Sequence, residues 1–86
     1  MTWEQYVKRR YVLISEGTKI LPSPAEIILK IITPNHVVRE EEIVYEFCKR
    51  TKIERSSVDR NIESALDKLV KKGRLVCVQP GYYRRK

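Results

Sequence analysis

The sequence predicts a mainly helical domain that closes with a small β-hairpin, an α+β fold. Apolar residues recur at helical spacing in several segments, most regularly between Val58 and Val70. After Gly73 the pattern changes, because a β-rich run over 74–78 precedes a Pro-Gly pair and a second short run over 82–85. The 86 residues suffice for one such domain. We divide it into an N-terminal helical extension, a three-helix core and a hairpin: 1–22, 23–73 and 74–86.

The first predicted helix runs from Thr2 to about Ile14. Thr2 and Gln5 match a capping box, in which each side chain accepts a hydrogen bond from the other residue's backbone amide. One face of this helix gathers five apolar or aromatic residues, Trp3, Tyr6, Val7, Tyr11 and Ile14. Such a face has to be buried, either on its own domain or against a second subunit. Because twofold dimers are the commonest assemblies, we predict a homodimer to which these five residues contribute.

The next two helices begin at clear start signals. Residues 23–26 combine a capping serine, a proline at the first helical position and a glutamate that can return to the cap, and Pro34 ends this helix. A short β-like pair, 37–38, precedes a helix over 39–51, whose acidic start at 40–42 suits the positive end of the helix dipole. Its expected inner face is formed by Ile43, Val44 and Phe47.

The last predicted helix, residues 56–72, has the most regular apolar stripe. Ser56 and Ser57 are expected to cap it, and Gly73 is a natural residue to follow it. The core-facing stripe consists of Val58, Ile62, Ala65, Leu66, Leu69 and Val70.

Three features occur together between residues 47 and 76. A short turn leads into Ser-Ser-Val at 56–58, a Leu-x-x-Leu-x-x-x-Gly pattern ends at Gly73, and a strand follows directly. With these features, residues 23–86 resemble a winged helix-turn-helix domain of bacterial and archaeal transcription regulators, whereas 1–22 have no counterpart in the minimal pattern. The resemblance implies that the helix over 56–72 enters the major groove of double-stranded DNA. It also implies that the hairpin, the wing over 74–86, follows the backbone or the minor groove.

The polar side of the helix over 56–72 separates by charge. At about 100° per residue, Asp59, Glu63 and Asp67 lie along one sector, and a second sector holds only donors and cations. Arg60 can grip a guanine edge and Asn61 an adenine edge, while the serines, the lysines and the wing arginines suit phosphates or a narrow minor groove. The predicted DNA-binding residues are Ser56, Ser57, Arg60, Asn61, Ser64, Lys68, Lys71, Arg84 and Arg85.

The net charge agrees with an anionic partner. Of the total of +7, residues 54–86 carry +5 and residues 1–22 carry +2, while 23–53 are balanced. The excess of Ile over Leu and the abundance of Lys, Arg and Glu are typical of a thermophilic or archaeal source.

Other function classes have less support. Two cysteines and one histidine cannot supply a four-ligand zinc site, so we expect no metal and no cofactor. The chain has no nucleophile–base pair and no Gly-rich phosphate loop, so we expect no enzyme. Without a signal pattern or a long apolar stretch, we expect an intracellular protein with no membrane or small-molecule partner.

Two alternatives to DNA binding stay open. One is a winged-helix protein–protein interaction module of a transcription or replication assembly, which should expose apolar residues on the outer side of the helix over 56–72. The other is RNA binding, although no aromatic platform with interleaved cations stands out. The operator, the regulated genes, the choice between repression and activation, and any disulfide at Cys48 or Cys77 do not follow from the sequence.

Overall fold

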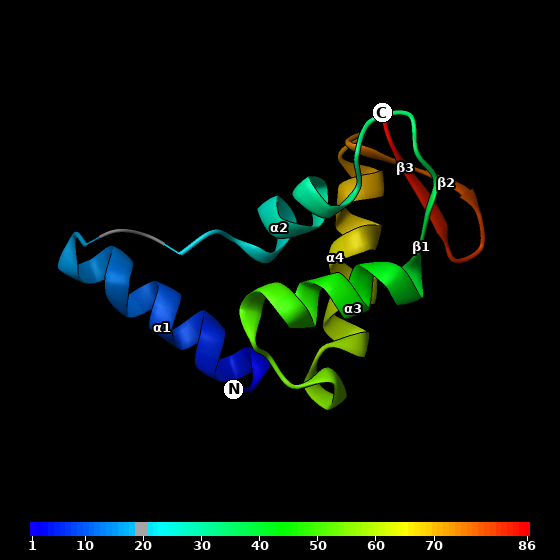
Figure 1. Ribbon diagram of the computed structural model, residues 1–86. Helices are drawn as coiled ribbons and strands as arrows, with labels where there is room; N and C mark the ends of the chain where they lie inside the picture. The colour runs from blue at the N-terminus through cyan, green and yellow to red at the C-terminus, as the bar shows by residue number, and fades with distance from the viewer. Residues whose placement is uncertain (19–20) are drawn as a thin grey trace.

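Helices make up most of the structure. The computed structural model describes residues 1–18 and 21–86, within which four α-helices accompany one three-stranded antiparallel sheet (Figure 1). The predicted α+β class is confirmed at this level. The predicted extension, 1–22, includes residues 19–20, which lie outside the described part. The elements are α1 (Trp3–Glu16), α2 (Pro24–Ile31), β1 (Val38–Arg39), α3 (Glu40–Thr51), a 3-10 turn (Arg55–Ser57), α4 (Asp59–Lys71), β2 (Leu75–Gln79) and β3 (Tyr82–Arg85).

Both predicted capping boxes are confirmed. The Thr2 hydroxyl accepts from the backbone N–H of Gln5 at 3.2 Å, and the Gln5 side chain accepts from the Thr2 amide at 2.9 Å. The same exchange joins Ser23 and Glu26, with Pro24 at the first position of α2. Helix α2 ends at Ile31, three residues before the proline that was expected to end it, because the backbone of the next residue is already extended.

The sheet brings distant segments together at one end of the molecule. Its order is β1-β3-β2, with Val38 opposite Tyr83 and Leu75 opposite Arg85. The β2–β3 hairpin was predicted, and its turn places Gly81 at φ 81°, a conformation that favours glycine. Gln79 pairs with Tyr82, so Pro80 and Gly81 form a two-residue turn. The register shift between Cys77 and Gln79 places a bulge within β2 instead.

The core fills the space between α2, α3, α4 and the sheet. Phe47 is fully buried, and Leu75 extends the core from the helices to β2. The largest fully buried side chains are Phe47, Ile28, Ile32, Ile43, Ile62, Leu66, Leu75 and Val58. Nothing among the helices of the described residues is both long and apolar enough to cross a membrane.

Helix α1 is held to this core mainly by its first turn. The Trp3 ring stacks on Phe47 with centroids 5.6 Å apart, and Tyr6 is buried with its hydroxyl donating to the carbonyl of Pro22. The Met1 carbonyl accepts from the amide of Glu54 at 2.7 Å. From this attachment α1 leads outward along one edge of the molecule (Figure 1).

Candidate nucleic-acid interface

The start of α4 differs from the prediction. Ser56 and Ser57 do not cap the helix, because they lie in the 3-10 turn and the helix begins three residues later, at Asp59, with Val58 as its N-cap. The Ser57 hydroxyl instead accepts from the Trp3 amide at 3.2 Å and donates to the carbonyl of Glu54 at 3.0 Å. Ser57 therefore ties α1 to the turn before α4, and only the exposed Ser56 leaves its side chain open to solvent.

One side of α4 presents donors and cations. Arg60, Ser64 and Lys71 are exposed. Asn61 is half-buried, and its side-chain amide donates to the carbonyl of Ser57 at 2.7 Å. One Asn61 amide hydrogen is thus engaged within the chain, and the remaining donor and acceptor are available to a ligand.

A groove runs between this side of α4 and the first turn of α2. Its volume is about 300 Å³, and its polar lining comes from Ser23, Asn61, Ser64, Lys68 and Lys72. Lys68 and Lys72 line the groove, and their two positive charges make it electropositive. Lys72 was missed by the sequence analysis because it was assigned to the helix end, although its position one turn beyond Lys68 could have indicated it.

The acidic sector of α4 faces the other way. Burial raises the pKa of the Glu40 carboxyl at the start of α3, and the charges of Glu63 and Asp59 raise it further. Burial also raises the pKa of the Tyr83 hydroxyl on β3, with Glu40 as the largest charged contributor. The acids of α4 therefore lie toward α3 and the sheet, away from the groove beside α2.

The two wing arginines point to opposite faces of the sheet. Arg84 is exposed and lies opposite Val76, whereas Arg85 lies opposite the buried Leu75 and is half-buried. Arg85 lines a hollow of about 340 Å³ with Leu29, Gly73, Arg74 and Lys86. The structure thus separates the pair, and it adds Arg74 and Lys86 as cations that the sequence analysis had not singled out. The alternation of side chains along a strand could have indicated the separation.

The five residues predicted to form a dimer also divide into two groups. Trp3 and Tyr6 pack on this chain's own core. Val7, Tyr11 and Ile14 are exposed, with 71% of Tyr11 open to solvent. The first group serves folding of the chain itself, and the second leaves an apolar strip without a partner in the described residues.

Within residues 1–18 and 21–86 no three His, Cys, Asp or Glu side chains are placed to hold a metal ion. Both cysteines are free; Cys77 is exposed and Cys48 is half-buried.

No protein-family model, curated protein or solved structure matches the chain.

Proposed function

We propose that this chain is an intracellular protein that binds double-stranded DNA and regulates transcription. Helix α4 enters the major groove, and the β2–β3 hairpin contacts the backbone or the minor groove. The order α2, β1, α3, α4, β2, β3 and the sheet order β1-β3-β2 are those expected for a winged helix-turn-helix domain, and they support this proposal.

The observation that carries the proposal is the polarity of α4's outer surface. Every exposed residue of α4 is polar, whereas its apolar residues are buried or half-buried. Asn61, Ser64 and Lys68 line the groove beside α2, and the acids turn toward Glu40. Arg60 lines a hollow with Asp59 and Glu63, so it lies where the cationic and acidic sectors meet. A helix with this division can approach phosphates along its cationic side while it keeps its carboxylates at a distance.

The alternative, docking of a protein on α4, lacks the feature it needs. Protein interfaces are depleted of charged residues at their centres and enriched in aromatic side chains. The exposed surface of α4 carries no such side chain among Asp59, Arg60, Glu63, Ser64, Asp67, Lys68 and Lys71. We therefore favour DNA over protein as the ligand of this helix.

A salt series of fluorescence anisotropy with mixed-sequence duplex DNA tests the proposal. Binding should weaken log-linearly with salt, with a slope of about −0.9 for each phosphate neutralised. Arg60→Ala should lower affinity about tenfold and leave the slope nearly unchanged, because Arg60 is expected at a base edge and not at a phosphate. Lys30→Ala is the matched control, because it removes an exposed cation of α2 that lines a hollow without any α4 residue.

Two results would contradict the proposal. One is the absence of duplex binding even at low salt. The other is an equal loss for Arg60→Ala and Lys30→Ala, which would indicate unspecific charge attraction. An excess of single-stranded DNA or double-stranded RNA as competitor separates the nucleic acids, because B-form recognition requires that neither displaces the duplex efficiently.

A further inference from the structure

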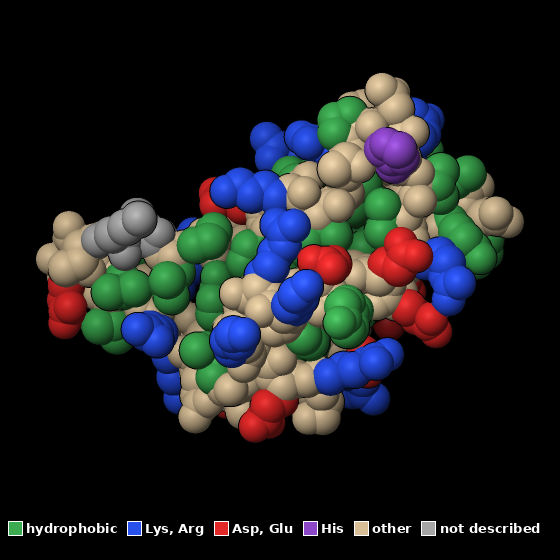
Figure 2. All heavy atoms as spheres, in the orientation of Figure 1, with side chains coloured by type: hydrophobic (Ala, Val, Ile, Leu, Met, Phe, Trp, Pro, Cys, Tyr) green, Lys and Arg blue, Asp and Glu red, His purple; other side chains and the backbone are tan. Residues whose placement is uncertain are grey.

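Two groups of exposed apolar side chains have no partner within the described residues. The first is the strip on α1 formed by Val7, Tyr11 and Ile14. The second lies over α3 and the segment before it, where Tyr45 is 63% exposed and Val37 is also open. In Figure 2 hydrophobic side chains gather along α1 at the left, and others lie among acidic side chains over α3. The three residues of the α1 strip are a group and not a single exposed apolar residue, which marks this face as a candidate contact surface.

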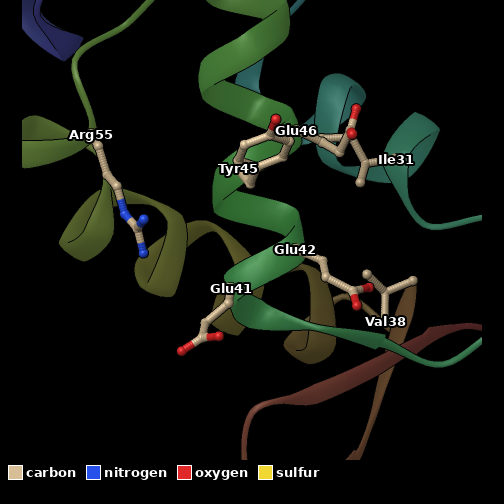
Figure 3. Close-up of a pocket in the computed structure, with 7 residues that line it drawn as sticks. All are labelled: Ile31, Val38, Glu41, Glu42, Tyr45, Glu46 and Arg55. Carbon is tan, nitrogen blue, oxygen red and sulfur yellow. The ribbon is translucent and has the colours of Figure 1, made fainter.

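The surface over α3 is a hollow of about 460 Å³ with an acidic rim. Its apolar lining comes from Ile31, Val38 and Tyr45, and its acids are Glu41, Glu42 and Glu46. Arg55 is the cation of the lining, and Figure 3 shows it on the opposite side of α3 from Ile31 and Val38. The side near α2 and β1 is therefore acidic and partly apolar.

Glu42 is the acid of this rim that is free to attract a cation. Glu41 already pairs with Arg39 at 2.7 Å, and Glu46 lies 3.8 Å from Arg50. Within the described residues Glu42 has no ion pair. Figure 3 shows its carboxylate beside Val38 on the apolar side of the hollow.

The exposed strip on α1 is apolar, as the hollow is, and it has a cation at its edge. At about 100° per residue, Val7, Tyr11 and Ile14 lie within one narrow sector, next to the sector that Trp3 and Tyr6 bury. Glu4 and Lys8 are both exposed along the same edge of this strip, one turn apart. Lys8 lies between Val7 and Tyr11 along the helix axis, and it forms no ion pair within the described residues. Arg9 lies on the other side of the helix. An apolar strip flanked by Lys8 thus fits an apolar hollow flanked by Glu42.

We propose that the occupant of the hollow is helix α1 of a second copy of this chain. The helix does not line the hollow of its own chain, and its first turn is fixed at the segment before α4. Since every copy carries both surfaces, two copies related by a twofold axis make the contact twice, with Lys8 of each beside Glu42 of the other.

The area favours this reciprocal arrangement over a single contact. A stable interface buries about 800 Å² on each partner. A strip of three side chains, of which the aromatic one contributes about 200 Å², covers roughly half of that area. When each copy contributes both its α1 strip and its hollow, the buried area roughly doubles and reaches the range of a stable dimer.

Sedimentation of charge-reversal variants, without DNA, tests the proposal. The wild type should be dimeric at tens of micromolar. Lys8→Glu should raise the dimer dissociation constant about tenfold, because two ion pairs become repulsive, and Lys8→Glu with Glu42→Lys should restore it. Arg9→Glu is the matched control, since it makes the same charge change on the far side of the same helix and should leave the dimer intact.

Cross-linking distinguishes the proposed contact from pairing of two α1 helices. In a Cys48→Ala, Cys77→Ser background, a mixture of Lys8→Cys and Glu42→Cys chains should form a disulfide-linked heterodimer under a glutathione redox buffer. A dimer linked through Lys8→Cys alone would overturn the proposed mode. So would a monomeric wild type, an Arg9→Glu effect equal to that of Lys8→Glu, or failure of the double reversal to restore the dimer.

Discussion

Two opposing effects act on the charge of the Glu40 carboxylate. Glu40 is the first residue of α3, where the positive end of the helix dipole favours a carboxylate. Burial nevertheless raises the pKa of its carboxyl above the ordinary value of 4.5, and Glu63 and Asp59 raise it further. The stability that depends on this group is fully present below its unfolded-state pKa, and it is lost as pH rises through the raised folded pKa. Relative to a neutral group, the charged Glu40 carboxylate therefore destabilises the fold.

We expect Glu40→Gln to raise the urea midpoint of unfolding at pH 7, because a neutral amide avoids the burial of a charge and removes the repulsion from Glu63 and Asp59. The gain should shrink as the pH falls below 4.5, where the wild-type carboxyl is itself protonated. Urea titrations at a series of pH values measure this. Glu41→Gln is the control and should bring no gain, since Glu41 is exposed and paired with Arg39. A midpoint for Glu40→Gln at or below that of the wild type at pH 7 would show that the helix dipole dominates.

At the scale of the elements, local signals predicted the helices well and distant contacts decided the rest. The capping boxes at Thr2 and Ser23 depend on residues three positions apart, so the sequence is sufficient to find them. Ser57 carries the same kind of signal, but its hydroxyl bonds the amide of Trp3, which lies 54 residues away. A pattern along the chain cannot show that the Trp3 amide takes the Ser57 hydroxyl away from the helix cap.

In the candidate site, too, some features depend on local sequence and others on contacts between distant segments. The sorting of charge around α4 is a property of helical spacing and could be derived from the sequence. The groove beside α2 and the grouping of Arg85 with Arg74 and Lys86 depend on how elements pack, and the sequence analysis did not contain them. Pairing of β1 with β3 was likewise not predicted, because a two-residue strand carries almost no pattern of its own.

The first turn of α1 contacts both the core and the segment before α4, through Trp3. We expect Trp3→Ala to lower the free energy of unfolding by about 2 kcal/mol, roughly half the loss of a fully buried aromatic, because Trp3 is half-buried against Phe47. Val12→Ala on the same helix should change it by less than about 0.5 kcal/mol, because Val12 is exposed. Urea unfolding followed by circular dichroism gives both values. Equal losses for the two variants would mean that α1 is stabilised by something other than this stacking.

At the scale of the whole molecule, cations lie on more than one surface. The longest dimension is 40 Å and the shortest is 18 Å. Arg60, Ser64 and Lys71 belong to the α4 side. Arg85, Arg74 and Lys86 surround a hollow beside α2's Leu29. The net charge of +7 is therefore not concentrated on one DNA-contacting surface. Part of it should only attract DNA at long range.

This division predicts different roles for the two adjacent wing arginines. Arg84 is exposed on the outer face of the hairpin, whereas Arg85 points to the face of the buried Leu75. If the hairpin contacts the DNA backbone, Arg84→Ala should reduce the slope of log affinity against log salt by about 0.9, and Arg85→Ala should leave it unchanged. The same anisotropy series measures both variants. Equal reductions would require both faces of the hairpin to reach one duplex, which the strand geometry opposes. A slope that neither variant changes would limit the contact to α4 and remove the hairpin from the interface.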